Sequence, residues 1–337
     1  MNFTTELLRP ARNISRQPPA NIDIRDDELF RDAYTYATLD CQLTRVANAG
    51  VSVDSVVYKN HAPLPASLYR SEDLSYYRFR YFAKMLLTAS KVRLDNSEEY
   101  LLATDRESSG HFHWLTEVLP RLWLIKHRAD DLVLMLPDTP YVRSVAQDSF
   151  DALGLRFKEI FWMKGGEFYA VPTLFQISKV SRTGQMNDAI MQELGRTFVG
   201  DRPRGERRLY VSRARARFRK VLNEPELEER LTAYGFEVVQ PDDWPLSEQI
   251  AAFSECTTLV GLHGAGLTNC LFMPPGGNVV ELRKREPNYG YWHLAESIGH
   301  RYFYYHGVPD SELTLIGRGC NLTVDVNDFE NAILKNL

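Results

Sequence analysis

The sequence predicts a two-domain α/β protein whose C-terminal domain contains a parallel sheet. The chain has 337 residues, which is more than a single hydrophobic core usually holds. In its second half, short apolar runs alternate with helical patterns over short connections. Such alternation is typical of parallel strands that are covered by helices on both faces of the sheet.

Three segments are predicted along the chain. Residues 1–185 are expected to form the N-terminal domain, and residues 186–325 the C-terminal domain. A helix at 186–200, followed by a polar linker rich in Pro, Gly and Arg, marks the boundary between them. Residues 326–337 are expected to form a C-terminal helix.

The N-terminal domain has a weak pattern in its first hundred residues and a clearer one afterwards. Strands are expected at 51–59 and 99–105, and the aromatic-rich segment 75–86 is expected to cover a core. A helix is expected at 111–128, with a kink at Pro120 because proline lacks the backbone donor. A strand, a helix and a strand then follow at 131–136, 141–154 and 159–163.

The C-terminal domain alternates regularly between strand and helix. Strands are expected at five apolar runs, namely 207–212, 236–240, 257–262, 278–282 and 301–305. Helices are expected between them at 224–235, 246–256, 266–273 and 291–299. We therefore expect five parallel strands with their carboxyl ends at one edge of the sheet.

Composition excludes some classes of protein. A net charge of −4 and a pI near 6.1 argue against a general nucleic-acid-binding protein, which is usually basic. The four cysteines are scattered and are expected to be free buried thiols; they are Cys41, Cys256, Cys270 and Cys320. Neither an apolar leader segment nor a membrane span is evident, so a cytoplasmic location is expected.

The carboxyl edge of the C-terminal sheet is the expected ligand site, because ligands of open parallel sheets bind there. The sequence His263-Gly264-Ala265-Gly266 follows one strand and opens a helix, where glycines let backbone N–H groups approach a phosphate. The alternative is a tight packed turn. Glu281 ends the next strand, where its carboxylate can accept hydrogen bonds from ribose hydroxyls, or can simply cap a helix or form an ion pair.

The arginine-rich stretch 201–220 indicates a localised anion site, although a solvated charged surface is the alternative. Arg213 directly follows a predicted strand at the same carboxyl edge, and Arg219 lies shortly after it. Guanidinium groups bind phosphate through two parallel hydrogen bonds and keep their charge when partly desolvated. Asn223 is expected to be the N-cap of the following helix.

A second group of chemically active residues lies in the N-terminal domain. His113 and Glu117 are four residues apart and share one helix face, which Arg121 continues. A histidine paired with a carboxylate can deprotonate a sugar hydroxyl or orient the group that does. The alternative is a structural histidine near the start of a helix.

Several known motifs are missing. The chain has no G-x-x-x-x-G-K-[ST] phosphate loop, complete dinucleotide fingerprint, H-E-x-x-H or G-x-S-x-G motif. It also has no Asp-x-Asp sequence, which commonly binds a metal-diphosphate pair. A diphosphate held by arginines and a helix terminus needs no metal, so neither a metal nor another cofactor is expected.

Four stretches together resemble glycosyltransferase family 61, and the resemblance covers roughly residues 105 to 305. They are GHFHWLTEVLPRL, RLYVSRARARFRKVLNEPEL, GFEVV and LVGLHGAGLTNCLFMPPGGNVVEL. The resemblance implies two Rossmann-like domains that face a cleft, an architecture called GT-B-like. It also implies a nucleotide-sugar donor, expected to be UDP-linked, bound to the C-terminal domain, and inversion at the anomeric carbon. One departure is Gly110-His111-Phe112, where many members have Asn and an aromatic residue before the histidine.

The resemblance also implies roles for individual residues. Arg213, Arg219 and the loop would hold the diphosphate, the loop comprising Gly264, Ala265, Gly266, Leu267 and Thr268. Glu281 would bind the ribose, whereas His263 could contact the diphosphate or the sugar, or only brace the turn. His113 and Glu117 match the family pattern on the acceptor side, and Asn223 with Glu224 matches an Asn-Glu pair whose role is open between binding and capping.

We therefore expect an inverting, metal-independent glycosyltransferase of surface polysaccharide synthesis. It would transfer a sugar to a hydroxyl of a glycan or lipid-linked oligosaccharide, in the cytoplasm or at the inner face of the membrane. Glu117 is slightly favoured over His113 as the base that deprotonates the acceptor. The alternative is a non-catalytic nucleotide-sugar-binding subunit of a polysaccharide assembly complex.

Overall fold

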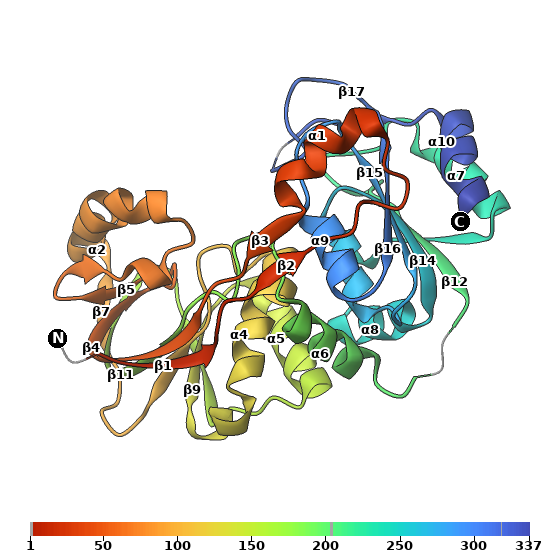
Figure 1. Cartoon of the computed structure of the whole chain (residues 1–337). Coiled ribbons are helices and arrows are strands. Elements are labelled where there is room, and N and C mark those ends of the chain that lie inside the picture. Colours follow the sequence, from red (N-terminus) through yellow and green to blue (C-terminus); the bar gives the residue numbers. More distant parts are fainter. Residues whose placement is uncertain (1–2, 203–204, 318) are drawn as a thin grey trace. The chain divides into compact units, whose positions relative to one another are not determined.

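A computed structural model describes residues 3–202, 205–317 and 319–337, and the chain divides into two compact units (Figure 1). Unit 1 contains the described residues up to Arg12 and residues 38–183, and unit 2 contains residues 13–37 and 184–337. The sequence analysis placed all of 1–185 in the N-terminal domain, whereas 13–37 packs with unit 2. Two residues of the expected linker, 203 and 204, lie outside the described residues.

The main sheet of unit 1 is mixed, with the strand order β10-β9-β8-β11-β4-β5-β6. The first four strands run parallel to one another, whereas β4 and β5 each pair with their neighbours in an antiparallel arrangement. In this order the strands are Glu159–Met163, Val133–Pro137, Tyr100–Leu102, Glu167–Ile177, Cys41–Ser52, Val57–Lys59 and Ala62–Pro63. Two further strands, β1 (Phe3–Arg9) and β7 (Ser90–Arg93), pair with β4 and β11.

The helix predicted at 111–128 is interrupted. It begins as α3 (His111–His113), widens into the π-helical turn η6 (Trp114–Val118) and continues as α4 (Leu119–Leu124). Pro120 lies in the first turn of α4, where its missing N–H is tolerated and the preceding turn is rearranged. The proline therefore acts on the turn that carries Glu117.

The remaining helices of unit 1 form as the sequence suggests. Helix α5 (Pro140–Leu153) begins where the Thr139 hydroxyl accepts a hydrogen bond from Val142 N and ends at Gly154, whose φ is 64°. The aromatic-rich segment forms η5 (Tyr76–Tyr81) and α2 (Phe82–Thr88), which bury Tyr77, Tyr81 and Met85 in a small core. The 3₁₀ turns are η3 (Pro65–Ser67), η4 (Ser71–Asp73) and η7 (Lys126–Asp131).

Unit 2 contains a five-stranded parallel sheet, which confirms the prediction of a parallel sheet in this half of the chain. The strand order is β13-β12-β14-β15-β16, and the strands are Phe236–Val239, Arg207–Val211, Cys256–Leu262, Asn278–Arg283 and Arg301–His306. The first strand in sequence, β12, therefore lies between the second and the third. The strand order reverses between β12 and β14, and open α/β sheets bind ligands at such a point.

The helices of residues 184–337 lie before, between and after these strands in the sequence. They are α6 (Asp188–Val199), α7 (Glu224–Ala233), η8 (Pro241–Asp243), α8 (Leu246–Ser254), η9 (Ala265–Phe272), α9 (Gly290–Ser297), α10 (Val326–Ala332) and η10 (Leu334–Asn336). The segment after β14 is a 3₁₀ helix, η9, where a helix was expected at 266–273. Two short strands, β17 (Val308–Pro309) and β18 (Leu322–Thr323), pair with each other. Val326 and Phe329 of α10 are buried in the core of the sheet.

The N-terminal segment 13–37 packs against α9 within unit 2, as the red ribbon beside α9 in Figure 1 shows. It forms β2 (Asn13–Ser15), η1 (Ile24–Asp26), α1 (Asp27–Phe30), η2 (Arg31–Ala33) and β3 (Thr35–Ala37). The Phe30 ring meets the Trp292 ring edge-on at 5.3 Å, and the buried His293 ring lies 2.9 Å from the Ala33 carbonyl. Burial lowers the pKa of His293 to about 4.

Two further features concern the cysteines and the lengths of the helices. All four cysteines are free and buried, as predicted. Across the described ranges, we find no helix of sufficient length and apolarity to span a membrane.

Arg16 fixes the N-terminal segment to α6, and its replacement tests that role. Its guanidinium donates two hydrogen bonds to Asp188, at 3.0 and 2.6 Å, and the Arg16 side chain is 2% exposed. We expect Arg16→Ala to lower the free energy of unfolding by about 3 kcal/mol, because it leaves a carboxylate without its partner. Urea unfolding followed by circular dichroism measures the change.

Arg25→Ala is the matched control, since Arg25 forms an exposed pair with Asp23 in the same segment. It should leave the unfolding midpoint unchanged. Equal midpoints for the two variants would show that the Arg16 pair does not stabilise the segment.

Candidate active site

The candidate residues fall into two groups, one in each unit. In unit 2 they lie at the carboxyl ends of β12 and β14, where the strand order reverses. Arg213 follows β12, and His263 and Gly264 follow β14. A Cβ atom on Gly264 would lie 2.8 Å from Arg213 Nη1, and one on Gly266 would lie 2.7 Å from Val211 Cγ1. The two glycines therefore allow the loop to pack closely against β12 and Arg213.

Arg213 and Arg219 are held together by main-chain carbonyl groups. Arg213 donates from Nε to the Arg219 carbonyl at 2.8 Å and from Nη2 to the Phe218 carbonyl at 3.1 Å. Arg219 donates from Nη1 to the Leu315 carbonyl at 3.0 Å. Within the described ranges, no carboxylate lies at ion-pair distance from either guanidinium. Burial and the neighbouring charge of Arg219 lower the pKa of Arg213.

The backbone at this pair is unusual. Arg219 has a φ of 58°, in the left-handed region that non-glycine residues rarely adopt. Residues held in this region often belong to functional sites, where the surrounding structure sustains the strain. Two neighbouring cations at the strand-order reversal, with no carboxylate at ion-pair distance among the described residues, form an arrangement that favours an anionic ligand.

Glu224 anchors the main chain of Arg213. Its buried carboxylate accepts hydrogen bonds from Arg213 N and from the Tyr210 hydroxyl, both at 2.8 Å. Asn223 occupies the N-cap position of α7, but its side chain makes no capping bond. It exchanges two hydrogen bonds with the Val324 main chain, at 2.7 and 3.0 Å. The expected cap is thus corrected, and Asn223 ties the start of α7 to the C-terminal segment.

Glu281 lies inside the sheet and not at the end of a strand. Strand β15 continues to Arg283, and the Glu281 side chain is buried. One carboxylate oxygen forms a short contact with His263 Nδ1, and the other accepts from the Tyr302 hydroxyl at 2.5 Å. Burial raises the pKa of Glu281, but its contact with His263 and the charge of Arg283 outweigh it and lower that pKa overall. Both oxygens already have partners, so this carboxylate is placed to orient His263.

The other ring nitrogen of His263 lies 3.2 Å from the Asn288 amide nitrogen. An amide N–H can only donate, so Nε2 acts as the acceptor and Nδ1 carries the proton toward Glu281. Along the loop, the side chains of Leu267 and Thr268 are buried. Both residues are buried as a whole, and the Leu267 N–H donates to the Gly264 carbonyl at 3.0 Å. The partly exposed residues of the loop are Ala265 and Gly266, so these are the ones that can meet a ligand.

The group in unit 1 is a buried network of charges. His113 Nδ1 lies 3.3 Å from Glu117 Oε1, and the Lys179 ammonium lies 3.7 Å from Glu117 Oε2. The same ammonium lies 3.7 Å from Asp105 Oδ2, which also accepts from Arg121 Nη2 at 2.9 Å. Burial raises the pKa of Glu117, but His113 and Lys179 outweigh it and lower the pKa overall. Glu117 is therefore ionised at neutral pH.

Arg121 belongs to the interior of this network. It is 3% exposed and also donates from Nη1 to the Ala103 carbonyl at 2.7 Å. The sequence placed His113, Glu117 and Arg121 on one helix face, yet Arg121 pairs with Asp105 and not with Glu117. The most exposed member is His113, with 20% of its side chain accessible against 8% for Glu117.

Asp105 and Lys179 were not predicted from the sequence. Asp105 follows β8 and Lys179 follows β11, two neighbouring parallel strands, so both lie beyond carboxyl ends. The carboxyl-edge rule would have selected both residues if β11 had been recognised. In the described part of the chain, no group of three or more His, Cys, Asp or Glu side chains is arranged to hold a metal ion.

Comparison with known proteins identifies the family. Residues 111–280, about half of the chain, match the family described as Glycosyltransferase 61. The chain belongs to the glycosyltransferase 61 family. The family match contains His113, Glu117 and Lys179 as well as Arg213 and Arg219, whereas Asp105 and Glu281 lie just outside it.

Relatives of this chain include animal and plant glycosyltransferases. The EGF domain-specific O-linked N-acetylglucosamine transferase of Drosophila melanogaster is 40% identical over 96 residues, which are 28% of this chain and 18% of that protein. Its counterpart in Canis lupus familiaris is 27% identical over 164 residues, 46% of this chain and 31% of that protein. Alpha-1,3-arabinosyltransferase XAT3 of Oryza sativa subsp. japonica is 34% identical over 130 residues, 35% of this chain and 22% of that protein. The chain thus spans less than a third of each of these relatives.

Gly264 provides a direct test of the anion site in this glycosyltransferase 61 member. A methyl group at Gly264 would displace the Arg213 guanidinium, whereas the loop backbone is extended there and unstrained. We expect Gly264→Ala to weaken the binding of inorganic pyrophosphate by about tenfold, the scale of one charge-assisted hydrogen bond. Isothermal titration calorimetry measures the affinity.

Gly165→Ala serves as the control, because a Cβ there meets nothing within 4 Å. This variant should bind pyrophosphate as the wild type does. If Gly264→Ala kept wild-type affinity, pyrophosphate would not bind between the glycine loop and Arg213.

Proposed function

We propose that this protein is an inverting glycosyltransferase that uses no metal. It would transfer a sugar from a nucleotide diphosphate, bound by unit 2, to a hydroxyl of a glycan or lipid-linked oligosaccharide. The observation that carries the proposal is the pair Arg213 and Arg219, which lies at the strand-order reversal without a carboxylate partner among the described residues. Membership of the glycosyltransferase 61 family supports the same reaction class.

In the proposed reaction, the acceptor oxygen attacks the anomeric carbon of the donor sugar. The bond between that carbon and the diphosphate oxygen breaks, and the bonding electrons leave with the nucleoside diphosphate. A single displacement of this kind inverts the configuration at the anomeric carbon. Negative charge grows on the diphosphate in the transition state, where Arg213, Arg219 and the loop N–H groups would stabilise it.

The acceptor proton passes to the network in unit 1. Glu117 is ionised at neutral pH and could take the proton, as the sequence analysis favoured. His113 is the more exposed partner, and its Nδ1 faces Glu117, so its Nε2 is available for an acceptor hydroxyl. This geometry favours His113 as the group that contacts the acceptor, with Glu117 stabilising the imidazolium that forms.

We propose a positioning role for the second histidine–carboxylate pair. Because Glu281 is buried and bonded to Tyr302 and His263, it would hold the His263 ring instead of binding ribose. The ring could then contact the donor diphosphate or sugar through Nε2 after displacing Asn288. The expected ribose contact at Glu281 has no accessible oxygen in this arrangement.

The donor is proposed to be UDP-linked, and the relatives suggest which sugars to test first. Their names specify N-acetylglucosamine and arabinose transfer, so UDP-N-acetylglucosamine and UDP-arabinose are the first donors to screen. The GT-B-like arrangement, the cytoplasmic location and a role in surface polysaccharide synthesis stay predictions. Donor binding without hydrolysis or transfer would favour the alternative, a nucleotide-sugar-binding subunit.

Removal of either clustered arginine tests the donor site. We expect Arg213→Ala and Arg219→Ala each to lower kcat by about 10²–10³-fold, the usual cost of removing one group that stabilises developing charge. Stabilisation of the protein by UDP in a thermal-shift assay should fall in parallel. Donor hydrolysis and sugar transfer are followed by release of UDP.

Arg215→Ala is the matched control, since Arg215 belongs to the same stretch but is exposed and pairs with the exposed Asp243, at 3.4 Å. It should retain wild-type turnover. Comparable losses in all three variants would attribute the effect to general charge, and unchanged turnover in Arg213→Ala would remove Arg213 from the mechanism.

The two candidates for the base are separated by chemical rescue. If His113 accepts the proton, His113→Ala should lose most of its turnover and regain part of it when free imidazole is added. Glu117→Gln should lose turnover without rescue by imidazole, because the ring remains and its charged partner is missing. A His113→Ala variant that transfers sugar at the wild-type rate would return the role to Glu117.

A further inference from the structure

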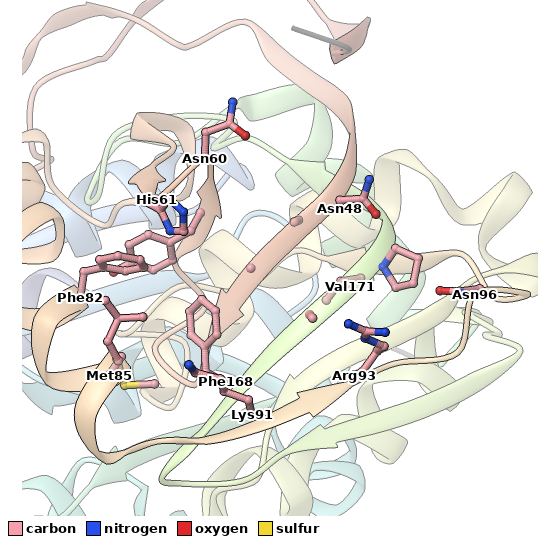
Figure 2. Close-up of a pocket in the computed structure, with 16 residues that line it drawn as sticks. Asn48, Asn60, His61, Phe82, Met85, Lys91, Arg93, Asn96, Phe168 and Val171 are labelled. Atoms are coloured by element: carbon pink, nitrogen blue, oxygen red, sulfur yellow. The ribbon is translucent and has the colours of Figure 1, made fainter.

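Unit 1 contains a cavity that the proposed reaction does not use. Its volume is about 700 Å³, within the range of pockets that hold small ligands. Figure 2 shows His61, Phe82 and Met85 on one side, Phe168 in the middle, and Asn48, Arg93 and Asn96 on the other side. None of the residues of the charge network around His113 lines it.

Small residues in the sheet create this cavity. Arg93 of β7 pairs with Ala170 of β11, which pairs with Gly50 of β4, which in turn pairs with Tyr58 of β5. In this row across four strands, a glycine and an alanine therefore lie between two large side chains. A Cβ on Gly50 would lie 2.5 Å from the Phe168 ring, so Gly50 also allows that ring to rest on the strand. Ala170 is exposed at the floor of the cavity.

The lining combines aromatic rings with polar side chains. The rings of Tyr58 and Phe82 lie 5.0 Å apart, and those of Tyr58 and Phe168 lie 5.7 Å apart. The amides of Asn48, Asn60 and Asn96 are exposed at the rim. A sugar ring has apolar C–H faces and polar hydroxyl edges, and amides can both donate to hydroxyls and accept from them. Rings and amides together therefore fit a carbohydrate better than a lipid tail.

The charge of the cavity is positive. Lys91 and Arg93 are two residues apart on β7, so both side chains lie on the same face of the sheet. No aspartate or glutamate is among the described residues that line the cavity. In the described part of the chain, neither cation has a carboxylate within ion-pair distance. An anionic group on the ligand would complement this pair.

Several residues that line the cavity have an uncommon backbone conformation. Among the described residues, five non-glycine residues have a positive φ, and three of them, Asn48, Asn60 and His61, line the cavity. Asn60 and His61 form the two-residue turn between β5 and β6, a hairpin type in which both residues adopt a positive φ. This turn places Asn60 and His61 at the cavity.

We propose that this cavity binds an oligosaccharide that carries a carboxylate or phosphate group, and that this oligosaccharide is the acceptor glycan. Its sugar rings would lie against Phe82 and Phe168, and its anionic group would bind Lys91 and Arg93. The acceptor role rests on the proposed function, whereas the binding of an acidic oligosaccharide does not. The cavity would thus select the acceptor through contacts away from the reacting hydroxyl.

The test titrates acidic oligosaccharides onto the full-length chain. A panel of uronate-, sialate- and phosphate-bearing oligosaccharides is compared with neutral oligosaccharides of the same length by isothermal titration calorimetry. We expect at least one acidic member to bind more tightly than its neutral counterpart. The double variant Lys91→Gln with Arg93→Gln should weaken that binding by at least about tenfold, as expected for charged hydrogen-bond donors.

Two further variants separate local effects from general ones. Ala170→Phe places a β-favouring aromatic ring on the exposed floor, so it should block the cavity without disturbing the core. The control Arg78→Gln with Lys84→Gln removes the same charge from exposed residues of the neighbouring helical segment that do not line the cavity. This control should bind acidic oligosaccharides as the wild type does.

Each outcome decides the proposal. It is overturned if no acidic oligosaccharide binds, or if the Lys91/Arg93 and Ala170 variants bind as the wild type does. Vesicles of phosphatidylcholine with and without phosphatidylglycerol form a separate arm, and binding seen only with anionic vesicles would assign the cations to a membrane surface instead. UDP binding and donor hydrolysis are measured on the same proteins. If UDP binding and donor hydrolysis are absent while oligosaccharide binding persists, the proposed function is wrong but the cavity proposal stands. If the cavity variants transfer sugar as the wild type does, only the acceptor role is wrong.

Discussion

The placement of two cations, Arg213 and Arg219, close together in sequence and structure is the constraint around which the candidate site of unit 2 is built. Burial and the charge of Arg219 lower the pKa of Arg213, and main-chain carbonyl groups accept hydrogen bonds from both side chains. Glu224 holds the Arg213 backbone, and the absence of a side chain at Gly264 leaves space for the guanidinium. The proposed diphosphate would offset the charge of both arginines, so electrostatics that are unfavourable in the free protein would favour its binding.

The charges in unit 1 are arranged in the opposite way. Glu117 and Asp105 share Lys179, and Arg121 completes the pairing, so each buried charge has a partner of opposite sign. Such a network attracts no further ion; it fixes protonation states instead, and it keeps Glu117 ionised beside His113. The contrast gives a physical basis for the proposed division of roles. Unpaired cations suit a leaving group that gains negative charge, whereas a neutralised network suits a proton that must be accepted at neutral pH.

The sequence predicted the parts of this structure that follow local rules. Strand–helix alternation indicated the parallel sheet of unit 2, and the carboxyl-edge rule selected Arg213 and Gly264. The rule failed at Glu281 because β15 runs two residues further, which turns an expected rim residue into a buried one. Strand β11 escaped notice because Pro172 interrupts its pattern. Association of residues 13–37 with unit 2 depends on partners such as Asp188, far away in sequence, which no local pattern reveals.

Non-glycine residues with a positive φ occur at both proposed ligand sites. Of the non-glycine residues with positive φ in the described ranges, Arg219 belongs to the guanidinium pair and Asn48, Asn60 and His61 to the cavity of unit 1. Much of that cavity comes from residues 48–96, which precede the segment matched by the family, whereas the arginine pair lies within the matched segment. Donor chemistry would then reside in the part of the chain that the family describes. Acceptor selection would reside largely in the part that precedes it, so the acceptor could differ between members while the donor site keeps the same physical design.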